Sequence, residues 1–152
     1  MAVLKHRIAD AEDLDILAEW NHQLIEDEGA RNPMTIAELR ARMACWIEAR
    51  EYRAVIFQDQ QFPVAYALYV ERAEEIHLRQ FFVTREHRRR GFGREAMNLL
   101  MTKLWPKRKS LTVDVLTHNT AAYTFWRECG YEADYIQMRR PGNDRNEVRK
   151  TA

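Results

Sequence analysis

Two glycines set among arginines make one short stretch of the chain suitable for binding an anion. Residues 85–96 read REHRRRGFGREA. Gly91 and Gly93 let the backbone approach a ligand closely and leave N–H groups facing outward. The spacing lacks the third glycine of a dinucleotide fingerprint and the Gly-Lys-Ser/Thr of a P-loop. Taken alone, the stretch fits a phosphate cradle, a basic patch for nucleic acid or an ordinary solvated loop.

The composition of the whole chain narrows these choices. It has 152 residues, of which 46% are hydrophobic, and a formal net charge of +1. This length suits one domain, and so balanced a charge argues against nucleic acid as a partner. No secretory signal and no membrane-length apolar run is visible, so we expect a cytoplasmic protein that does not enter the membrane. Cys45 and Cys129 lie far apart in the sequence, which argues against a zinc site; we expect no metal.

The hydrophobic periodicity predicts the elements that must position the loop. The predicted order is β-α-α-β-β-β-α-β-α-β, which indicates an α/β fold with a mixed sheet flanked by helices. Residues 1–140 are predicted to form one domain, followed by a polar tail at 141–152. Strands are expected at 3–8, 52–59, 63–70, 76–83, 111–116 and 131–140, and helices at 10–25, 35–47, 91–105 and 119–129.

Two motifs within this order resemble a known family. Residues 83–100, VTREHRRRGFGREAMNLL, resemble the acetyl-CoA pyrophosphate loop of the GCN5-related N-acetyltransferase (GNAT) family. Residues 119–131 contain Asn119, Ala122, Phe125, Trp126 and a final Gly-Tyr pair, which is similar to the family's pattern N-x-x-A-x-x-F-Y-x-x-x-G-F. The predicted element order is also that of the family, so the resemblance covers nearly the whole chain.

The resemblance implies acetyl-CoA as the cofactor, held in a slot between the strands at 76–83 and 111–116. The backbone of Phe81, Phe82 and Val83 would pair with the pantetheine amides, and the N–H groups of residues 89–94 would hold the pyrophosphate. Arg88 and Arg90 would add charge-assisted hydrogen bonds. The other implied cofactor-site residues are Arg89, Gly91, Phe92, Gly93, Arg94, Asn119 and Trp126. Arg89 and Arg94 could instead be solvated, and Phe92 could instead pack in the core.

The family's chemistry implies direct attack of an amine on the acetyl carbonyl, which requires a proton acceptor. His77 occupies the position where family members often place a carboxylate base. Glu75 and Asp114 are alternatives, and His77 could also be a packed strand residue. Trp126 stands where many members have a proton-donating tyrosine, and an indole cannot take that role. Tyr123, one turn earlier, could replace it or be a packing aromatic.

In this family the segment between the first two helices borders the acceptor site. Here residues 20–34 read WNHQLIEDEGARNPM, in which carboxylates could attract a cationic amine. The implied acceptor residues are Asn21, Glu28, Arg31, Asn32 and Gln80. We therefore expect a small primary amine or an amino-acid-like metabolite as acceptor, with a protein N-terminus or lysine as the alternative. An idle acyl-CoA sensor also remains open. The short final strand would leave the groove open or completed by a second subunit, as in a homodimer.

Overall fold

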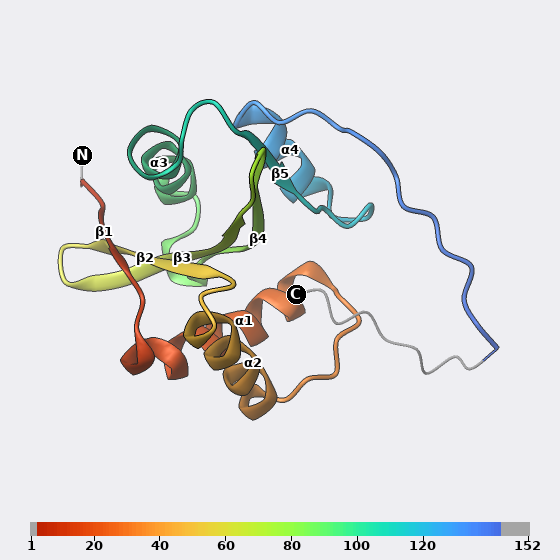
Figure 1. Cartoon of the computed structure of the whole chain (residues 1–152), viewed down its shortest axis with the longest axis horizontal. Helices are drawn as coiled ribbons and strands as arrows, with labels where there is room; N and C mark the ends of the chain where they lie inside the picture. Colours follow the sequence, from red (N-terminus) through yellow and green to blue (C-terminus); the bar gives the residue numbers. More distant parts are fainter. Residues whose placement is uncertain (1–2, 144–152) are drawn as a thin grey trace.

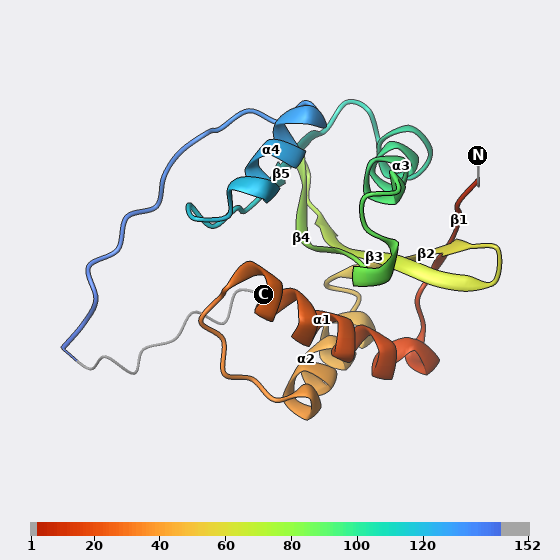
Figure 2. The ribbon, with the colours of Figure 1, turned by 180° about the vertical axis from the view of Figure 1, so that it is seen from behind.

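A computed structural model describes residues 3–143 and contains a five-stranded sheet with the order β1-β2-β3-β4-β5. Neighbouring strands are antiparallel except for β4 and β5, which are parallel. Helices α1 and α2 cover one face of the sheet, and α3 and α4 lie on the other (Figures 1 and 2). The predicted α/β class with a mixed sheet is therefore confirmed. The strands are β1 (Lys5–Ile8), β2 (Arg53–Asp59), β3 (Phe62–Glu71), β4 (Glu75–Val83) and β5 (Ser110–Val113).

The helices begin and end where the sequence carries capping residues. Thr35 caps α2 in a reciprocal capping box with Glu38, and Gly29 ends α1 with a left-handed φ of 64°. No helix among the described residues is long and apolar enough to cross a bilayer. The helices are α1 (Leu14–Glu28), α2 (Ile36–Glu48), α3 (Phe92–Leu99, continued by a π-helical turn at Leu100–Leu104) and α4 (Thr120–Glu128).

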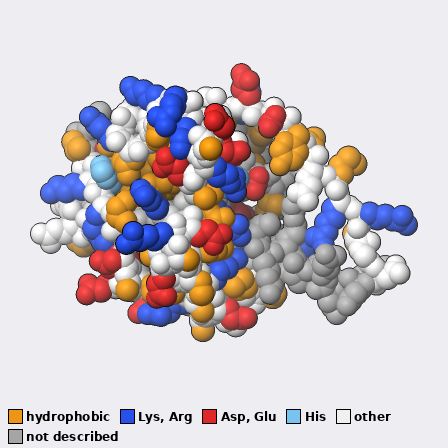
Figure 3. Space-filling view, in the orientation of Figure 1, with side chains coloured by type: hydrophobic (Ala, Val, Ile, Leu, Met, Phe, Trp, Pro, Cys, Tyr) orange, Lys and Arg blue, Asp and Glu red, His pale blue; other side chains and the backbone are white. Residues whose placement is uncertain are grey.

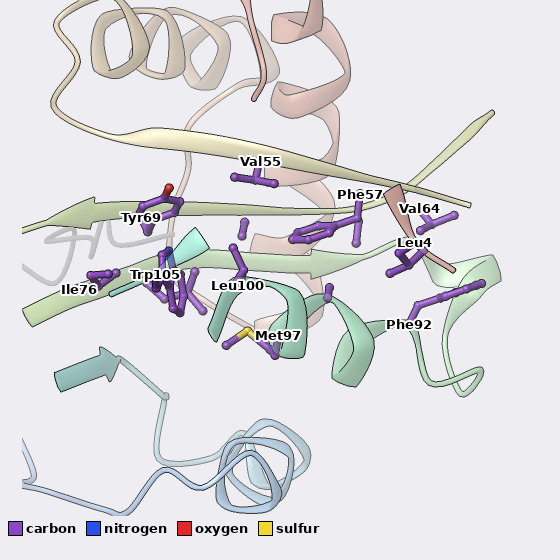
Figure 4. Close-up of a cluster of buried hydrophobic side chains, with 14 of the residues drawn as sticks. Leu4, Val55, Phe57, Val64, Tyr69, Ile76, Phe92, Met97, Leu100 and Trp105 are labelled. Carbon is purple, nitrogen blue, oxygen red and sulfur yellow. The ribbon is translucent and has the colours of Figure 1, made fainter. Parts of the chain in front are cut away.

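Alternate residues of the strands face two separate cores. Val55 and Phe57 of β2 belong to the core between the sheet and α3, shown in Figure 4. Ile56, which lies between them, belongs to the core under α1 and α2. This alternation follows from the period of two residues in a strand. Because both faces are buried, the register of the sheet is strongly specified.

Two irregularities in β4 prepare the site. Its pairing with β5 ends at Leu78 opposite Val113, although β4 continues to Val83. On its other side, the register with β3 shifts so that Leu68 faces Gln80 and Tyr69 faces Leu78, which leaves Arg79 as a bulge. Strands β4 and β5 thus begin side by side and then separate, between the positions where the resemblance implies a slot.

The strand predicted at 131–140 is absent. After α4 the chain leaves the body of the protein in an irregular, extended course (Figure 1). The alternation of YEADYIQMRR suits a strand, but a strand also needs a neighbouring edge to supply its hydrogen bonds. In its place Tyr135, Ile136 and Met138 are 79%, 74% and 89% exposed. The part of the predicted tail from 144 to 152 lies outside the described residues.

Candidate active site

The glycine loop joins β4 to α3 and has the shape that its sequence predicts. A 3-10 turn at Arg85–His87 follows β4, and Gly91 precedes the first residue of α3 with φ of 81°. A Cβ at Gly91 would meet nothing within 4 Å, so glycine is needed there for its backbone angle. At Gly93 a Cβ would lie 3.4 Å from the Phe125 ring, which reflects close packing against α4. The first N–H groups of α3 have no intrahelical acceptor and are suited to bind an anion.

The arginines of this loop differ in their surroundings. Arg88 donates to Asp27 at 2.5 Å and to the Val83 carbonyl at 2.8 Å, and Arg85 donates to Asp27 at 2.9 Å. Although burial acts to raise it, the pKa of Asp27 is lowered by these hydrogen bonds. Arg88 is thus held at the loop by an internal carboxylate, which the sequence did not reveal.

The remaining arginines of the loop are on its outside. Arg94 forms an ion pair with Glu128 of α4, and Arg90 lies over the Phe92 ring. Arg89 is exposed and has a left-handed φ of 61°. Figure 3 shows Lys and Arg side chains interspersed with Asp and Glu over the visible face, with no continuous basic surface there.

The candidate proton acceptor His77 belongs to a hydrogen-bonded chain between β4 and β5. Thr112 donates its hydroxyl proton to Glu75 at 2.6 Å, and its Oγ1 lies 2.8 Å from His77 Nδ1. Since the hydroxyl has only one proton, Oγ1 must accept from Nδ1–H. A neutral His77 therefore carries its lone pair on Nε2, which lies 3.5 Å from Asp114. The three candidates from the sequence, His77, Glu75 and Asp114, are thus parts of one network.

A buried polar cluster lies between the sheet and the α1–α2 pair. Gln80 and Asn21 are 2% and 0% exposed. Tyr66 donates to Gln80 Oε1 at 2.9 Å, and Arg42 donates to Asn21 Oδ1 at 3.3 Å. Burial, together with the charge of Arg79, lowers the pKa of Arg42 to about 10. The amide nitrogens of Gln80 and Asn21 have no hydrogen-bond partner among the described residues.

The last turn of α1 contacts the chain on both sides of the separating strands. Asp27 binds the arginines that follow β4, and His118, which follows β5, donates from Nε2 to the Glu28 carbonyl at 2.8 Å. Burial, reinforced by the negative charge of Asp27, raises the pKa of Glu28 to about 7. Glu28 also contributes to raising the pKa of the buried Tyr66, after burial itself. This carboxylate is therefore coupled to the polar cluster.

Aromatic side chains from α4 form the wall beside β4. The ring of Phe81 lies 6.0 Å from that of Phe125 and 5.7 Å from that of Trp126. Trp126 is buried, whereas Tyr123 is 48% exposed. Asn119 caps α4 by accepting from the Ala122 N–H, which leaves its amide nitrogen available to donate to a cofactor.

The side chains of several predicted site residues pack in a core, form a hydrogen bond within a turn or are exposed to solvent. Phe82 and Phe92 are buried in the two cores, so only their backbone groups are available to a cofactor. Asn32 accepts from the Met34 N–H at 3.0 Å within the turn after α1, and Arg31 is exposed. Arg42 and Tyr66 were not predicted from the sequence. The available signal for Tyr66 was its hydroxyl group, the polar end of a side chain within an otherwise apolar strand.

Other features of the described chain offer no competing centre. No group of three or more His, Cys, Asp or Glu side chains in residues 3–143 could hold a metal ion. One surface hollow of about 420 Å³ lies at the far end of the sheet and is lined mainly by charged side chains, among them Arg53 and Lys109. The chemistry-bearing residues instead gather where β4 and β5 part.

Comparison with known proteins agrees with this geometry. The sequence model of the acetyltransferase (GNAT) family matches residues 14–131. The chain belongs to the GNAT family. No curated protein sequence matches this GNAT chain.

Solved structures share the GNAT fold at low sequence identity. A possible acetyltransferase from Clostridium difficile 630 has a TM-score of 0.77 at 18% identity, covering 92% of this chain and 98% of that one. The aminoglycoside N-acetyltransferase AAC(6')-Iy, crystallised with CoA, has a TM-score of 0.73 at 13% identity and coverages of 94% and 97%. A ribosomal-protein-alanine N-acetyltransferase from Brucella melitensis biovar Abortus 2308 has a TM-score of 0.69 at 11% identity and coverages of 91% and 99%. At such identities the likeness establishes the fold of this GNAT chain and leaves its substrate open.

Proposed function

We propose that this protein transfers the acetyl group of acetyl-CoA to the primary amine of a small, amino-acid-like acceptor. The observation that carries the proposal is that β4 loses its partner β5 after Leu78 and then leads directly into the glycine loop at the start of α3. The cofactor, when bound, supplies an acetyl group activated as a thioester. The described residues suit this cofactor. The start of α3 can bind an anion, and next to it lies the part of β4 that, in the described chain, has no strand on its β5 side.

The chain's own residues divide the binding between them. Backbone groups of Phe81, Phe82 and Val83 provide donors and acceptors for amides of the pantetheine arm. The N–H groups of residues 89–94 hold the pyrophosphate, with Arg90 adding charge. A guanidinium has five N–H donors, so Arg88 can add a bond to phosphate while keeping its contact with Val83.

We propose His77 as the proton acceptor. The acceptor amine forms a bond from nitrogen to the acetyl carbon, the carbon–sulfur bond breaks, and the ammonium proton passes to His77 Nε2 directly or through water. Thr112 keeps the lone pair on Nε2 by accepting from Nδ1–H, and Asp114 stabilises the imidazolium that forms. The thiolate takes a proton from solvent or from Tyr123, whose side chain is exposed.

The carboxylate of Glu28 is placed to bind the positive charge of the acceptor amine. This carboxylate is half-buried, and the neighbouring Asp27 already takes both arginines, so a cationic amine is the natural counter-ion for Glu28. The amide nitrogens of Gln80 and Asn21 are unpaired but buried, so they would donate to a carbonyl or carboxylate of the same acceptor only if the α1–α2 pair moves away from the sheet. One neighbouring structure is named for aminoglycosides and another for a ribosomal protein, so a protein N-terminus remains the second acceptor class.

The test is release of free thiol from acetyl-CoA over a panel of amines. The panel contains amino acids, polyamines, aminoglycosides and short peptides with free N-termini. Stimulation by a small cationic amine supports the proposal, and stimulation by peptides alone would favour the protein acceptor. Tight CoA binding without any stimulated release would instead identify an acyl-CoA sensor.

A further inference from the structure

A second group of cationic side chains lies at the end of the sheet away from the glycine loop. It lines the hollow of about 420 Å³, a volume within the range of small-molecule sites. Strand β4 runs from this end of the sheet to the glycine loop, so the two places are roughly 25 Å apart. The lining contains four cationic side chains, from Arg50, Arg53, Arg72 and Lys109, and two carboxylates, from Glu51 and Glu71. Positive charge is therefore in excess in the hollow.

A buried tyrosine contributes to the lining of this hollow. Tyr69 is only 4% exposed, and the register of β2 with β3 places Arg53 directly opposite it. Figure 4 shows Tyr69 beside Trp105 at the end of the core opposite Phe92. Burial raises the pKa of Tyr69, and the positive charge of Arg53 opposes this shift. A phenol that stays protonated can donate a hydrogen bond to an anion.

The ammonium group of Lys109 is held at the hollow by two acceptors. Its side chain is 9% exposed, and it donates to Glu71 at 2.8 Å and to the Arg72 carbonyl at 2.7 Å. Since an ammonium has three N–H donors, one is left after these two described acceptors. The hydrogen bond from Lys109 lowers the pKa of Glu71, and the charges of Lys109, Arg53 and Arg108 add to this effect. The Glu71 carboxylate is thus itself surrounded by cations.

Arg50 occupies a backbone position that favours glycine. It follows Ala49, the C-cap of α2, has a left-handed φ of 54°, and donates its N–H to the Ile47 carbonyl. Helices often end on glycine at this position, because a left-handed φ costs other residues free energy. The chain instead places a long cationic side chain beside the hollow. Backbone strain of this kind clusters at functional sites.

We propose that this hollow binds the phosphate group of a small molecule. Its donors come from four segments of the chain: Arg50 after α2, Arg53 in β2, Tyr69 in β3 and Lys109 before β5. Donors from several directions suit a tetrahedral group, and a guanidinium fork matches two phosphate oxygens at once. A planar carboxylate would engage fewer of these donors. The site is separate from the glycine loop and does not depend on the proposed function.

Hydrogen bonds and an ion pair connect the hollow to His77. Arg72 Nη1 lies 3.5 Å from Glu75 Oε2, the same oxygen that accepts from Thr112 at 2.6 Å. Thr112 in turn accepts from His77 Nδ1. A phosphate in the hollow would compete with Glu75 for Arg72, so we expect the ring signals of His77 to shift as the hollow fills. Only an effect of this shift on turnover would rest on the proposed function.

An NMR titration resolved by backbone amide tests the site, with inorganic phosphate and glycerol 3-phosphate as probes. Amides of residues 50–53, 69–73 and 109 should shift with one common affinity, which separates this site from binding at residues 89–94. Sodium chloride at the same ionic strength should shift them far less. Equal shifts in chloride, or no shifts at the hollow, would overturn the proposal. Tighter binding of succinate than of phosphate would assign the hollow to dicarboxylates, and the phosphate assignment would be wrong.

Arg50→Gly should change binding and stability in opposite directions. It removes a charged donor, so the affinity of the hollow for phosphate should fall roughly tenfold. It also removes the strain of the left-handed φ, so Tm should rise by roughly 2–4 °C. Arg89→Gly is the matched control, because Arg89 has a similar φ of 61° but lies in the glycine loop. Its Tm should rise as well, with the affinity of the hollow unchanged.

Two results would contradict this account of the hollow. Unchanged phosphate affinity in Arg50→Gly would refute the site, and His77 ring signals that stay fixed while the hollow fills would refute its connection to His77. The wild-type titration remains decisive if a variant fails to fold. Because NMR shifts need no catalysis, they separate this proposal from a failure of the proposed function.

Discussion

Replacing Glu28 by glutamine should stabilise the folded protein at alkaline pH. Burial and the charge of Asp27 raise the pKa of Glu28 from 4.5 to about 7. Each pKa unit corresponds to about 1.4 kcal/mol, so the ionised carboxylate costs the folded state up to about 3 kcal/mol. Relaxation of the surroundings reduces that ceiling, and we expect about 2 kcal/mol.

The sign of the pH dependence follows from this raised pKa. Between about pH 4.5 and pH 7 the folded protein binds more protons at Glu28 than the unfolded chain does, so this group lowers stability as pH rises. Glu28→Gln should therefore be as stable as wild type near pH 4.5. Its stability relative to wild type should increase progressively up to pH 7 and stay constant above that pH. At pH 8 the expected gain is roughly 4–8 °C in Tm for a chain of this size.

Urea and thermal unfolding at a series of pH values measure this gain. Glu19→Gln, an exposed carboxylate on the same helix, is the matched control and should show no such pH-dependent gain. A raised pKa of Glu28 is refuted if Glu28→Gln is no more stable than wild type at pH 8, or if its gain in stability is equally large at pH 4.5. If Glu28 binds the acceptor amine, the same variant should also raise KM for a cationic amine while leaving CoA affinity unchanged.

Three further predictions concern the proton path, the loop and the α1 turn. His77→Ala should lower kcat by roughly a hundredfold at neutral pH and flatten the acidic limb of the pH–rate profile, with CoA affinity kept; an unaltered profile would contradict its role as base. Gly91→Ala should weaken CoA binding and cost about 1 kcal/mol of unfolding free energy, measured by calorimetry, because φ is 81° there; unchanged values would argue against the loop's backbone role. Asp27→Asn should lower the pKa of Glu28 below about 7, read by carbon-13 titration of its carboxyl group, since a neighbouring negative charge is removed; a pKa that stays or rises would be inconsistent with this cause.

The loop and most helices and strands could be predicted because their signals are local. Gly91 takes a backbone angle that other residues avoid, and Thr35 with Glu38 caps a helix within one turn of the chain. The strand at 131–140 was predicted wrongly for the complementary reason. Its alternating pattern is a local property, but a strand forms only where the fold brings the segment against a second edge, and here the chain after α4 runs away from the open edge of β5 (Figure 1).

The connections within the candidate site could not be predicted in the same way. His77 and Thr112 are 35 residues apart, and Arg88 and Asp27 are 61 residues apart. Many side chains of each type are present, and no local pattern says which of them meet. The resemblance to a family indicated where a base could stand, but not that Glu75, Asp114 and His77 belong to one network.

By itself the sequence determined where the chain turns, caps and alternates, and hence the class of fold and the position of the glycine loop. These features depend on backbone angles and on the period of apolar residues, which neighbouring residues control. Only the tertiary structure decided the charge of the site. The pKa of Glu28 rises, and that of Asp27 falls, because one is buried without a cation and the other is held by Arg85 and Arg88. Adjacent carboxylates thus acquire opposite properties from what the fold places around them.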